Sequence, residues 1–186
     1  MSNKNKMRLY LAYWRRQAKL DEGISYHVGL ILSPKDPENN EDKVAMIYHA
    51  INRVIKLKHK AIEAWIFESK LSVPRTERLA GCMLLGKVSS TLEVDDITRI
   101  LSTVHVPDQK EAEERNWRCS HWVLDALTLL EEKGIIPKLV DSPENTWRTG
   151  KAFVNELTGG NLNHNEPLYT CDTSGKKIGS EIPALD

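Results

Sequence analysis

The chain has 186 residues, which is close to the usual size of one domain and enough to bury a substantial core. Lysine and arginine number 26, as do aspartate and glutamate, so the formal net charge is zero and no overall field attracts nucleic acid or an anionic membrane. The apolar stretch near the N-terminus is too short for the core of a signal peptide or for a membrane span. We therefore expect one soluble, cytoplasmic domain that binds no nucleic acid and makes no stable membrane insertion.

Strand patterns fill the first half of the sequence. Residues 7–14 alternate loosely between apolar and polar side chains, and residues 24–32 form a stronger strand pattern. A polar loop then separates the second strand from residues 44–51, which is typical of an antiparallel hairpin with a long surface loop. Further strand patterns lie at residues 53–57, 61–67 and 79–88. Most of the sheet is therefore expected before residue 90.

Helix signals follow the strands. Ser90 and Glu93 have the spacing of a capping box, and apolar residues recur at helical spacing from there to Pro107. A polar connection, residues 107–116, leads to the stretch RNWRCSHWVLDALTLLEEKG, in which Gly134 is a stop signal. This second helix has one apolar face, formed by Trp122, Val123, Ala126, Leu127 and Leu130.

A third helix is predicted from its end signals. Ser142 and Pro143 are typical of a helix start, and Gly159 is typical of a helix stop. The sequence beyond is polar and is expected to be loop-like. Strands before helices indicate an α+β fold, with an antiparallel sheet packed against the core helix that bears a cysteine. We expect this single domain to span residues 1–160 and a polar C-terminal tail to span residues 161–186.

The cysteines differ in their surroundings. Cys82, Cys119 and Cys171 are far apart and odd in number, and they lack CxxC spacing, which argues against a disulfide framework and a cysteine zinc site. Cys119 begins the second helix and precedes the buried Trp122 by three positions, so its side chain is expected to face inward. Helix-start N–H groups and Arg118 favour the thiolate there. A small core cysteine is the alternative interpretation.

Two histidines lie inside apolar strands and differ from the other four. Alternation places His27 on one strand face with Gly29, where the missing side chain leaves space beside the imidazole, and His49 is expected on a neighbouring strand. His121 falls on the polar stripe of its helix. The remaining histidines lie in polar surroundings and are expected at the surface: His59, His105 and His164. A hydrogen-bonded strand histidine is the simpler interpretation of His27 or His49 alone, but two of them before a helix-start cysteine indicate a catalytic set.

The stretches YHVGLIL and YHA, followed by RCSHWVLDAL, resemble the circularly permuted papain-like (NlpC-type) thiol enzymes. The pattern is most similar to that of the lecithin retinol acyltransferase-like and PPPDE-type groups, and it is also similar to small fungal proteins. In these families a strand histidine comes first, a second polar residue follows on the next strand, and the nucleophilic cysteine opens a later helix. The resemblance implies a permuted papain-like fold, with Cys119 as nucleophile, His27 as general base and His49 as the orienting group.

The chemistry that suits these residues is acyl transfer through a thioester on Cys119. The backbone N–H groups of Cys119 and Ser120 are expected to form part of an oxyanion hole. No metal or organic cofactor is needed, and we expect a small-molecule or peptide-like substrate. Water as acceptor gives hydrolysis, and an amine or alcohol gives transfer; the sequence leaves open which occurs, as it does the oligomeric state. A non-catalytic binding module on the same fold is the alternative function.

Overall fold

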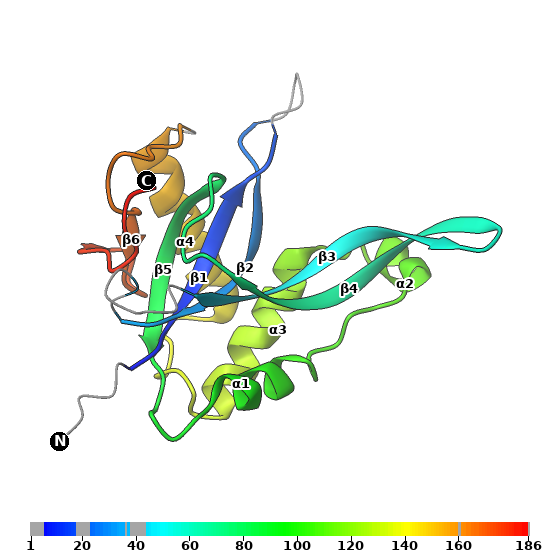
Figure 1. The fold of residues 1–186 in the computed structure, drawn as a ribbon, viewed down its shortest axis with the longest axis horizontal. Helices are drawn as coiled ribbons and strands as arrows, with labels where there is room; N and C mark the ends of the chain where they lie inside the picture. Colours follow the sequence, from blue (N-terminus) through cyan, green and yellow to red (C-terminus); the bar gives the residue numbers. More distant parts are fainter. Residues whose placement is uncertain (1–5, 18–22, 36, 38–43, 160, 186) are drawn as a thin grey trace.

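The computed structural model describes residues 6–17, 23–35, 37, 44–159 and 161–185. Its centre is a seven-stranded sheet in the order β4-β3-β2-β1-β5-β6-β7 (Figure 1). All neighbouring strands run antiparallel except β5 and β6, which are parallel. The strands are β1 (Arg8–Arg15), β2 (Tyr26–Ser33), β3 (Ala45–Leu57), β4 (Lys60–Ser72), β5 (Leu79–Lys87), β6 (Thr170–Cys171) and β7 (Lys177–Ile178).

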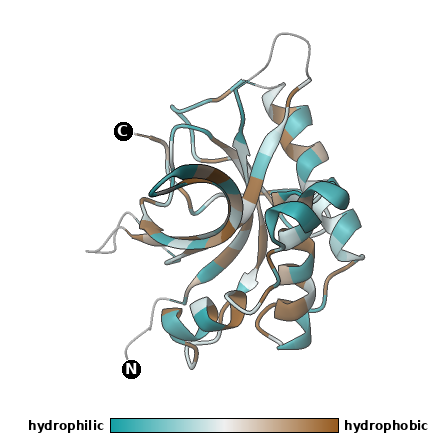
Figure 2. Ribbon diagram, turned by 90° about the vertical axis from the view of Figure 1, so that its right-hand side faces the viewer, coloured by the Kyte–Doolittle hydropathy of each residue, from teal (hydrophilic) through white to brown (hydrophobic). Residues whose placement is uncertain are grey.

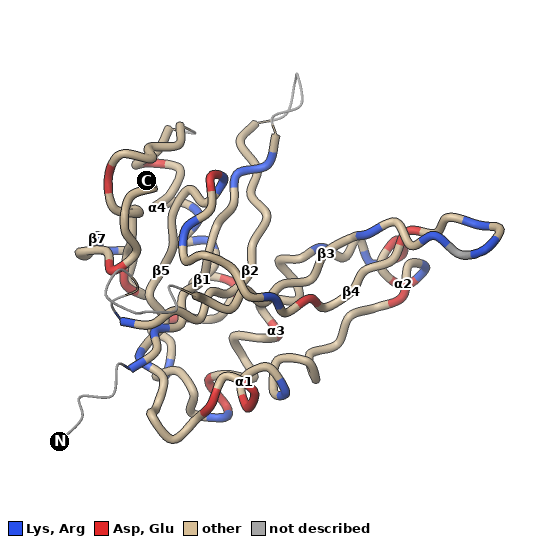
Figure 3. Tube along the Cα trace, viewed as in Figure 1, with Lys and Arg blue, Asp and Glu red and all other residues tan. Residues whose placement is uncertain are grey.

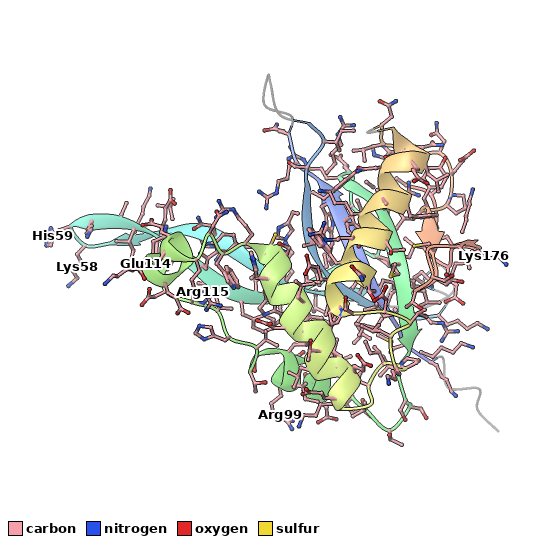
Figure 4. All side chains as sticks on the ribbon, turned by 180° about the vertical axis from the view of Figure 1, so that it is seen from behind. Lys58, His59, Arg99, Glu114, Arg115 and Lys176 are labelled. Carbon is pink, nitrogen blue, oxygen red and sulfur yellow. The ribbon has the colours of Figure 1, made fainter. Side chains whose placement is uncertain are left out.

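Helices α3 and α4 cover one face of this sheet, as the view from behind shows (Figure 4). Helix α3 contacts β2 and β3, and α4 contacts β1 and β5. The helices are α1 (Val94–Leu101), α2 (Gln109–Glu114), α3 (Cys119–Glu132) and α4 (Pro143–Thr158). None of the helices in the described part of the chain is both long and apolar enough to cross a membrane.

Two apolar cores lie on the two faces of the sheet. The larger core lies against α3 and contains Trp122, Leu127 and Leu130, which are fully buried. The smaller core lies on the opposite face, where Leu168 and Ile182 from the end of the chain pack against the sheet. Because apolar cores cover both faces, most residues of β1 and β2 are buried; Figure 2 shows hydrophobic (brown) and hydrophilic (teal) residues along the sheet.

The predicted α+β class and the largely antiparallel sheet are confirmed. Helix α3 begins at Cys119, with Trp122 on its buried side. Helix α4 begins after Ser142, whose hydroxyl accepts a hydrogen bond from the backbone N–H of Asn145, and ends at Gly159 in the left-handed conformation, with φ 51°. These local signals were sufficient because capping side chains and glycine act on the backbone within one turn.

Three expectations need correction. Residues 44–51 and 53–57 form one continuous strand, β3, because β3 and β4 pair along their full lengths in a hairpin. Helix α1 is capped by Glu93 instead of Ser90, and Asp96 Oδ2 accepts from the Glu93 backbone N–H at 3.1 Å. The polar connection contains α2, which Asp108 caps by accepting from the Glu111 N–H.

The expectation of a loop-like tail was also wrong in part. The short strand β6 pairs with β5, with Cys82 opposite Thr170, and β7 extends the sheet by one further strand. The buried guanidinium of Arg75 holds the tail by donating to the backbone carbonyl oxygens of Asn163, Glu166 and Pro183. The tail was hard to identify because its order depends on pairing with a distant strand.

The β3–β4 hairpin projects from the body of the molecule (Figure 1), and Lys58 and His59 lie at its tip (Figure 4). Helix α2 contacts β4, and the Trp65 ring meets that of Trp117 edge to face, with centroids 5.0 Å apart. Lysine and arginine residues gather at the hairpin tip, while the two charge signs are mixed over the rest of the chain (Figure 3). The hairpin is therefore attached at its base and exposed at its end.

Close packing between α4 and β1 gives a test of the fold. A Cβ atom at Gly150 would collide with the Tyr13 hydroxyl, which donates to the Trp147 carbonyl oxygen at 2.7 Å. Alanine improves helix propensity by about 1 kcal/mol, but overpacking costs about 1–3 kcal/mol and the buried hydrogen bond is also disturbed. We therefore expect Gly150→Ala to lower the free energy of unfolding in urea by about 1–3 kcal/mol.

The matched control is Glu156→Ala at an exposed position of the same helix, which should change stability by less than about 0.5 kcal/mol. A Gly150→Ala protein that is more stable than the wild type would contradict the contact with Tyr13.

Candidate active site

Strands β2 and β3 diverge on one side of a short paired segment. They pair from Leu30 to Leu32 only, whereas β3 and β4 pair over the whole of β3. Just before the divergence, a Cβ atom on Gly29 would lie 2.7 Å from the Tyr48 carbonyl oxygen and 2.8 Å from the His49 Cβ atom. Only a glycine allows this approach, which brings His49 beside β2.

The side chains of His27 and His49 are in contact at this divergence. From His49 the chain of hydrogen bonds continues to a carboxylate on the next strand, β4. His27 Nε2 lies 2.8 Å from His49 Nδ1, and His49 Nε2 lies 2.9 Å from Glu68 Oε2. His49 is 7% exposed, so the chain of hydrogen bonds runs through a nearly buried imidazole. The structure therefore brings together the two histidines that the sequence singled out.

The three-residue chain fixes the proton positions. A carboxylate accepts hydrogen bonds, so His49 Nε2–H donates to Glu68 and His49 Nδ1 carries the lone pair. His27 Nε2–H then donates to His49 Nδ1, which leaves Nδ1 of His27 unprotonated. A neutral His27 oriented in this way has a lone pair available to accept a proton.

The electrostatic surroundings keep both imidazoles neutral. Burial is the largest cause that lowers the pKa of His27 to about 3, and repulsion from His49 and Arg16 adds to it. Burial also lowers the pKa of His49, although its hydrogen bond to Glu68 acts in the opposite direction. Neutral histidines at physiological pH agree with the donor and acceptor roles assigned above.

Glu68 was not identified from the sequence. Burial raises its pKa, but the hydrogen bond from His49 and the charges of Lys70 and Arg53 outweigh burial and lower the pKa. Arg53 Nη2 lies 2.5 Å from Glu68 Oε1, so the carboxylate is held from two sides. Pairing across the hairpin places His49 directly opposite Glu68. If the sequence had been interpreted as two continuous strands joined by a tight turn at residues 58–59, the hairpin register would have predicted Glu68 as the partner of His49.

Cys119 lies at the first position of α3 and is 3% exposed. Arg16 Nη2 lies 3.5 Å from Cys119 Sγ, and no hydrogen bond joins Cys119 to His27 among the described residues. Tyr26 and Val28 line a cavity with Cys119, whereas His27, between them on β2, does not. The structure therefore places the predicted nucleophile and the predicted base in separate cavities.

Two arginines link these cavities. A cavity of about 620 Å³ is lined by His27 and His49, and a smaller one of about 180 Å³ is lined by Cys119 and Ser120. Arg16 and Arg118 line both. A third cavity, of about 490 Å³, also reaches His27 and His49 and is bounded by Trp14. The histidine pair is thus accessible from two cavities, and the thiol cavity adjoins one of them.

The start of α3 leaves backbone donors unused. Within the described residues, the N–H groups of Cys119 and Ser120 make no hydrogen bond, whereas the His121 N–H donates to the Arg118 carbonyl oxygen at 2.9 Å. His121 is exposed, and its Nδ1 accepts from the Arg118 backbone N–H at 3.0 Å, so it caps the helix. The two unused N–H groups are those expected for an oxyanion hole.

The remaining histidines lie away from the histidine pair, and no metal site is formed among the described residues. Of the surface histidines, His105 lies 3.3 Å from Glu111, His164 contacts the Glu77 carbonyl oxygen, and His59 lies at the hairpin tip (Figure 4). Across the described ranges, no group of three or more His, Cys, Asp or Glu side chains has the arrangement to hold a metal ion.

A family model described as "Family of unknown function (DUF6914)" matches residues 6–158. No curated protein and no solved structure matches the chain. The matched region runs to the last residue of α4 and includes His27, His49, Glu68 and Cys119. The segment that forms β6 and β7 lies outside it.

The three thiols are expected to differ in reactivity. Burial raises the pKa of Cys82 and that of Cys171 to about 12, so neither forms appreciable thiolate at neutral pH. Cys119 lines a cavity beside Arg16. Under native conditions iodoacetamide should therefore modify Cys119 first, as measured by peptide mapping with mass spectrometry. Labelling of the three cysteines at equal rates in the folded protein would contradict this assignment, and Cys119→Ser is the control for peptide identity.

The low pKa of His27 gives a pH dependence of stability. Its pKa is lower in the folded state, about 3, than the ordinary 6.5, so between these values the unfolded chain binds more protons. This contribution to the free energy of unfolding is complete above pH 6.5 and is lost progressively as the pH falls toward 3. We expect His27→Gln to lose stability less steeply than the wild type over that range, measured by urea unfolding at a series of pH values.

A shallower but nonzero slope should remain, because the pKa of His49 is also lowered. His59→Gln at the exposed hairpin tip is the matched control and should leave the wild-type slope unchanged. An unaltered slope in His27→Gln would mean that His27 is not held neutral by the fold.

Proposed function

The chain belongs to this family of unknown function, so its activity must be inferred from its own residues, and we propose a cysteine-dependent acyl hydrolase or acyltransferase. In this proposal Cys119 is the nucleophile, His27 the general base and His49 the orienting group, within a permuted papain-like core. The observation that carries it is the hydrogen-bonded chain His27–His49–Glu68, whose free nitrogen is a proton acceptor. A lone structural histidine would not require a second imidazole and a carboxylate behind it.

The position of the thiol supports the same proposal. Cys119 starts a 14-residue helix, where backbone N–H groups and the helix dipole favour negative charge. The guanidinium of Arg16 is 3.5 Å from Sγ, so a positive charge lies beside the sulfur. The cysteine, the helix start and the cation thus supply the features of an activated thiol.

The proposed reaction proceeds in two halves. His27 Nδ1 accepts the thiol proton, the sulfur forms a bond to the acyl carbon, and the backbone N–H groups of Cys119 and Ser120 stabilise the oxyanion. As the tetrahedral intermediate collapses, His27 returns the proton to the leaving amine or alcohol and a thioester remains on Cys119. Water, an amine or an alcohol then attacks the thioester, again with His27 as base, which restores the thiol.

Glu68 has a role in both halves. When His27 gains a proton it becomes a cation, and its Nε2–H donates to His49, which is hydrogen-bonded to the carboxylate of Glu68. The negative charge of Glu68 stabilises that cation through the intervening ring. Glu68 is therefore a positioning residue, because it acts through His49 and does not touch the substrate.

Proton transfer requires His27 and Cys119 to come together, because Tyr26 and Val28 line the thiol cavity while His27, between them on β2, points to the other face of the strand. His27 and Cys119 line different cavities and share no hydrogen bond within the described residues. Catalytic hydrogen bonds tighten on substrate binding in many enzymes, and Arg16, which lines both cavities, lies at their junction. The proposal therefore expects substrate binding to bring Nδ1 of His27 toward Sγ.

A non-catalytic binding module is the second candidate. It is favoured by one observation, namely that the nearly buried Cys119 contacts Arg16 and not His27. In that case the cavity beside the histidine pair would hold a ligand without turnover.

Variants tested on activated esters, amides and peptide conjugates separate these functions. Cys119→Ala should abolish formation of a covalent acyl adduct, and His27→Ala should slow acylation by roughly 10²–10⁴-fold, the usual contribution of a general base. His49→Ala should retain more activity than His27→Ala because it does not itself transfer the proton. Intact mass spectrometry of the adduct and its rate of formation are the measurements.

Two further variants act as controls. Glu68→Gln keeps an oxygen that accepts from His49 but removes the charge, so it should lose less activity than His49→Ala. His121→Ala, which removes only the cap of α3, should lose least. Wild-type turnover by Cys119→Ala would refute the thiol mechanism, and the absence of any adduct on a reactive Cys119 would favour the binding module.

A further inference from the structure

The cavity at the start of α3 has an unusual set of charges. It has a volume of about 180 Å³ and is lined by Arg16, Arg118 and Lys151 together with Cys119. No carboxylate lines it among the residues that the structure describes. The adjoining cavity of about 620 Å³ contains Glu63 and Glu113. We call the smaller cavity the α3 cavity.

The three cations make no ion pair with a carboxylate among the residues that the structure describes. Arg16 contacts Cys119 Sγ, Arg118 donates to the Trp117 carbonyl oxygen, and Lys151 lies over the Trp147 ring at 5.8 Å. None of the ion pairs between described residues includes any of the three. Elsewhere on α4, by contrast, Arg148 is paired with Glu144 at 2.7 Å. The α3 cavity therefore gathers positive charge that no carboxylate of the described residues pairs with.

Two residues that line the α3 cavity have buried hydrogen-bond donors without a partner among the described residues. Tyr26 is 9% exposed, and its buried hydroxyl has no hydrogen-bond partner among the described residues. The indole Nε1 of Trp147 is likewise buried without a partner. Buried donors without partners are rare because each costs free energy, so two of them on residues that line one cavity favour a ligand that accepts hydrogen bonds.

We propose that the α3 cavity binds an oxyanion, a carboxylate or phosphate group of the substrate. Guanidinium groups match planar and tetrahedral oxyanions, and the start of a long helix favours negative charge. The small volume admits a charged group and not a whole peptide, so the rest of the substrate occupies the larger cavity beside the histidines. The substrate class is then an acidic acyl compound with its negative charge near the reacting carbonyl carbon. The assignment of this substrate class rests on the proposed function, whereas binding of an oxyanion in the α3 cavity does not, because anion binding needs no reaction.

Two alkylating reagents, one negatively charged and one neutral, test the proposal. Iodoacetate and iodoacetamide react with a thiolate in the same way, with loss of iodide, but only iodoacetate carries a carboxylate next to the reacting carbon. In the folded protein, the ratio of the Cys119 labelling rate by iodoacetate to that by iodoacetamide should exceed the ratio in the urea-unfolded protein by about tenfold. That is the size expected from one charge-assisted hydrogen bond. Ionic strength is held constant throughout.

Variants and competitors locate the effect. Lys151→Gln and Arg118→Gln should each lower the ratio several-fold, whereas Lys133→Gln, the same change at the far end of α3, should leave it unchanged. Sodium acetate and inorganic phosphate are added separately as competitors against sodium chloride. Protection of Cys119 by acetate identifies a carboxylate site, and protection by phosphate identifies a phosphate site.

A thermal readout makes the test independent of thiol reactivity. In Cys119→Ser, the effective competitor should raise the Tm, and adding Lys151→Gln should reduce that rise. A ratio no higher in the folded than in the unfolded protein, together with no Tm shift by acetate or phosphate, would overturn the proposal. If the ratio is raised but no acyl adduct ever forms, anion binding stands and the proposed reaction fails. If neutral and acidic esters acylate Cys119 equally, the reaction stands and the anion proposal fails.

Discussion

The arrangement of the histidines depends on the absence of a side chain at Gly29. Any Cβ atom there would meet the Tyr48 carbonyl oxygen and the His49 Cβ atom well inside van der Waals contact, so β3 would have to move away from β2. With glycine, the strands approach closely, and His27 reaches His49 at 2.8 Å just where they diverge. One imidazole then orders the other, and Glu68 on the third strand sets the direction of both hydrogen bonds.

The second organising feature is Arg16, which follows β1 directly. Its backbone N–H donates to the Ser25 carbonyl oxygen at 2.9 Å, so the ends of β1 and β2 are held together. Its guanidinium reaches Cys119 and lines both the thiol cavity and the histidine cavity. Burial and positive charge keep the histidines neutral, while the same cation favours negative charge at the helix start. The two cavities thus present a proton acceptor on one side and an anion-attracting wall on the other.

Much of the fold followed from signals that act over a few residues. The strand patterns of β1, β2 and β5 and the caps of α4 are local, because strand-forming residues and end capping act on neighbouring residues. The strands β6 and β7 were missed because each has only two residues: β6 takes its order from β5, more than eighty positions earlier, and β7 pairs in turn with β6. Helix α2 was missed because its sequence buries little: of its residues only Ala112 is buried.

The sequence by itself determined which side chains could take part in a site: Cys119 by its place before the apolar face of α3, and His27 and His49 by their places inside apolar strands. These are one-dimensional properties, since the backbone conformation of a short segment decides which way its side chains point. Only the tertiary structure decided that Glu68 lies behind His49, that Arg16 lies beside the thiol, and that the thiol and His27 open into separate cavities. Those relations depend on strand register and on the placing of α3 under the sheet, which are set by packing between residues far apart in the chain.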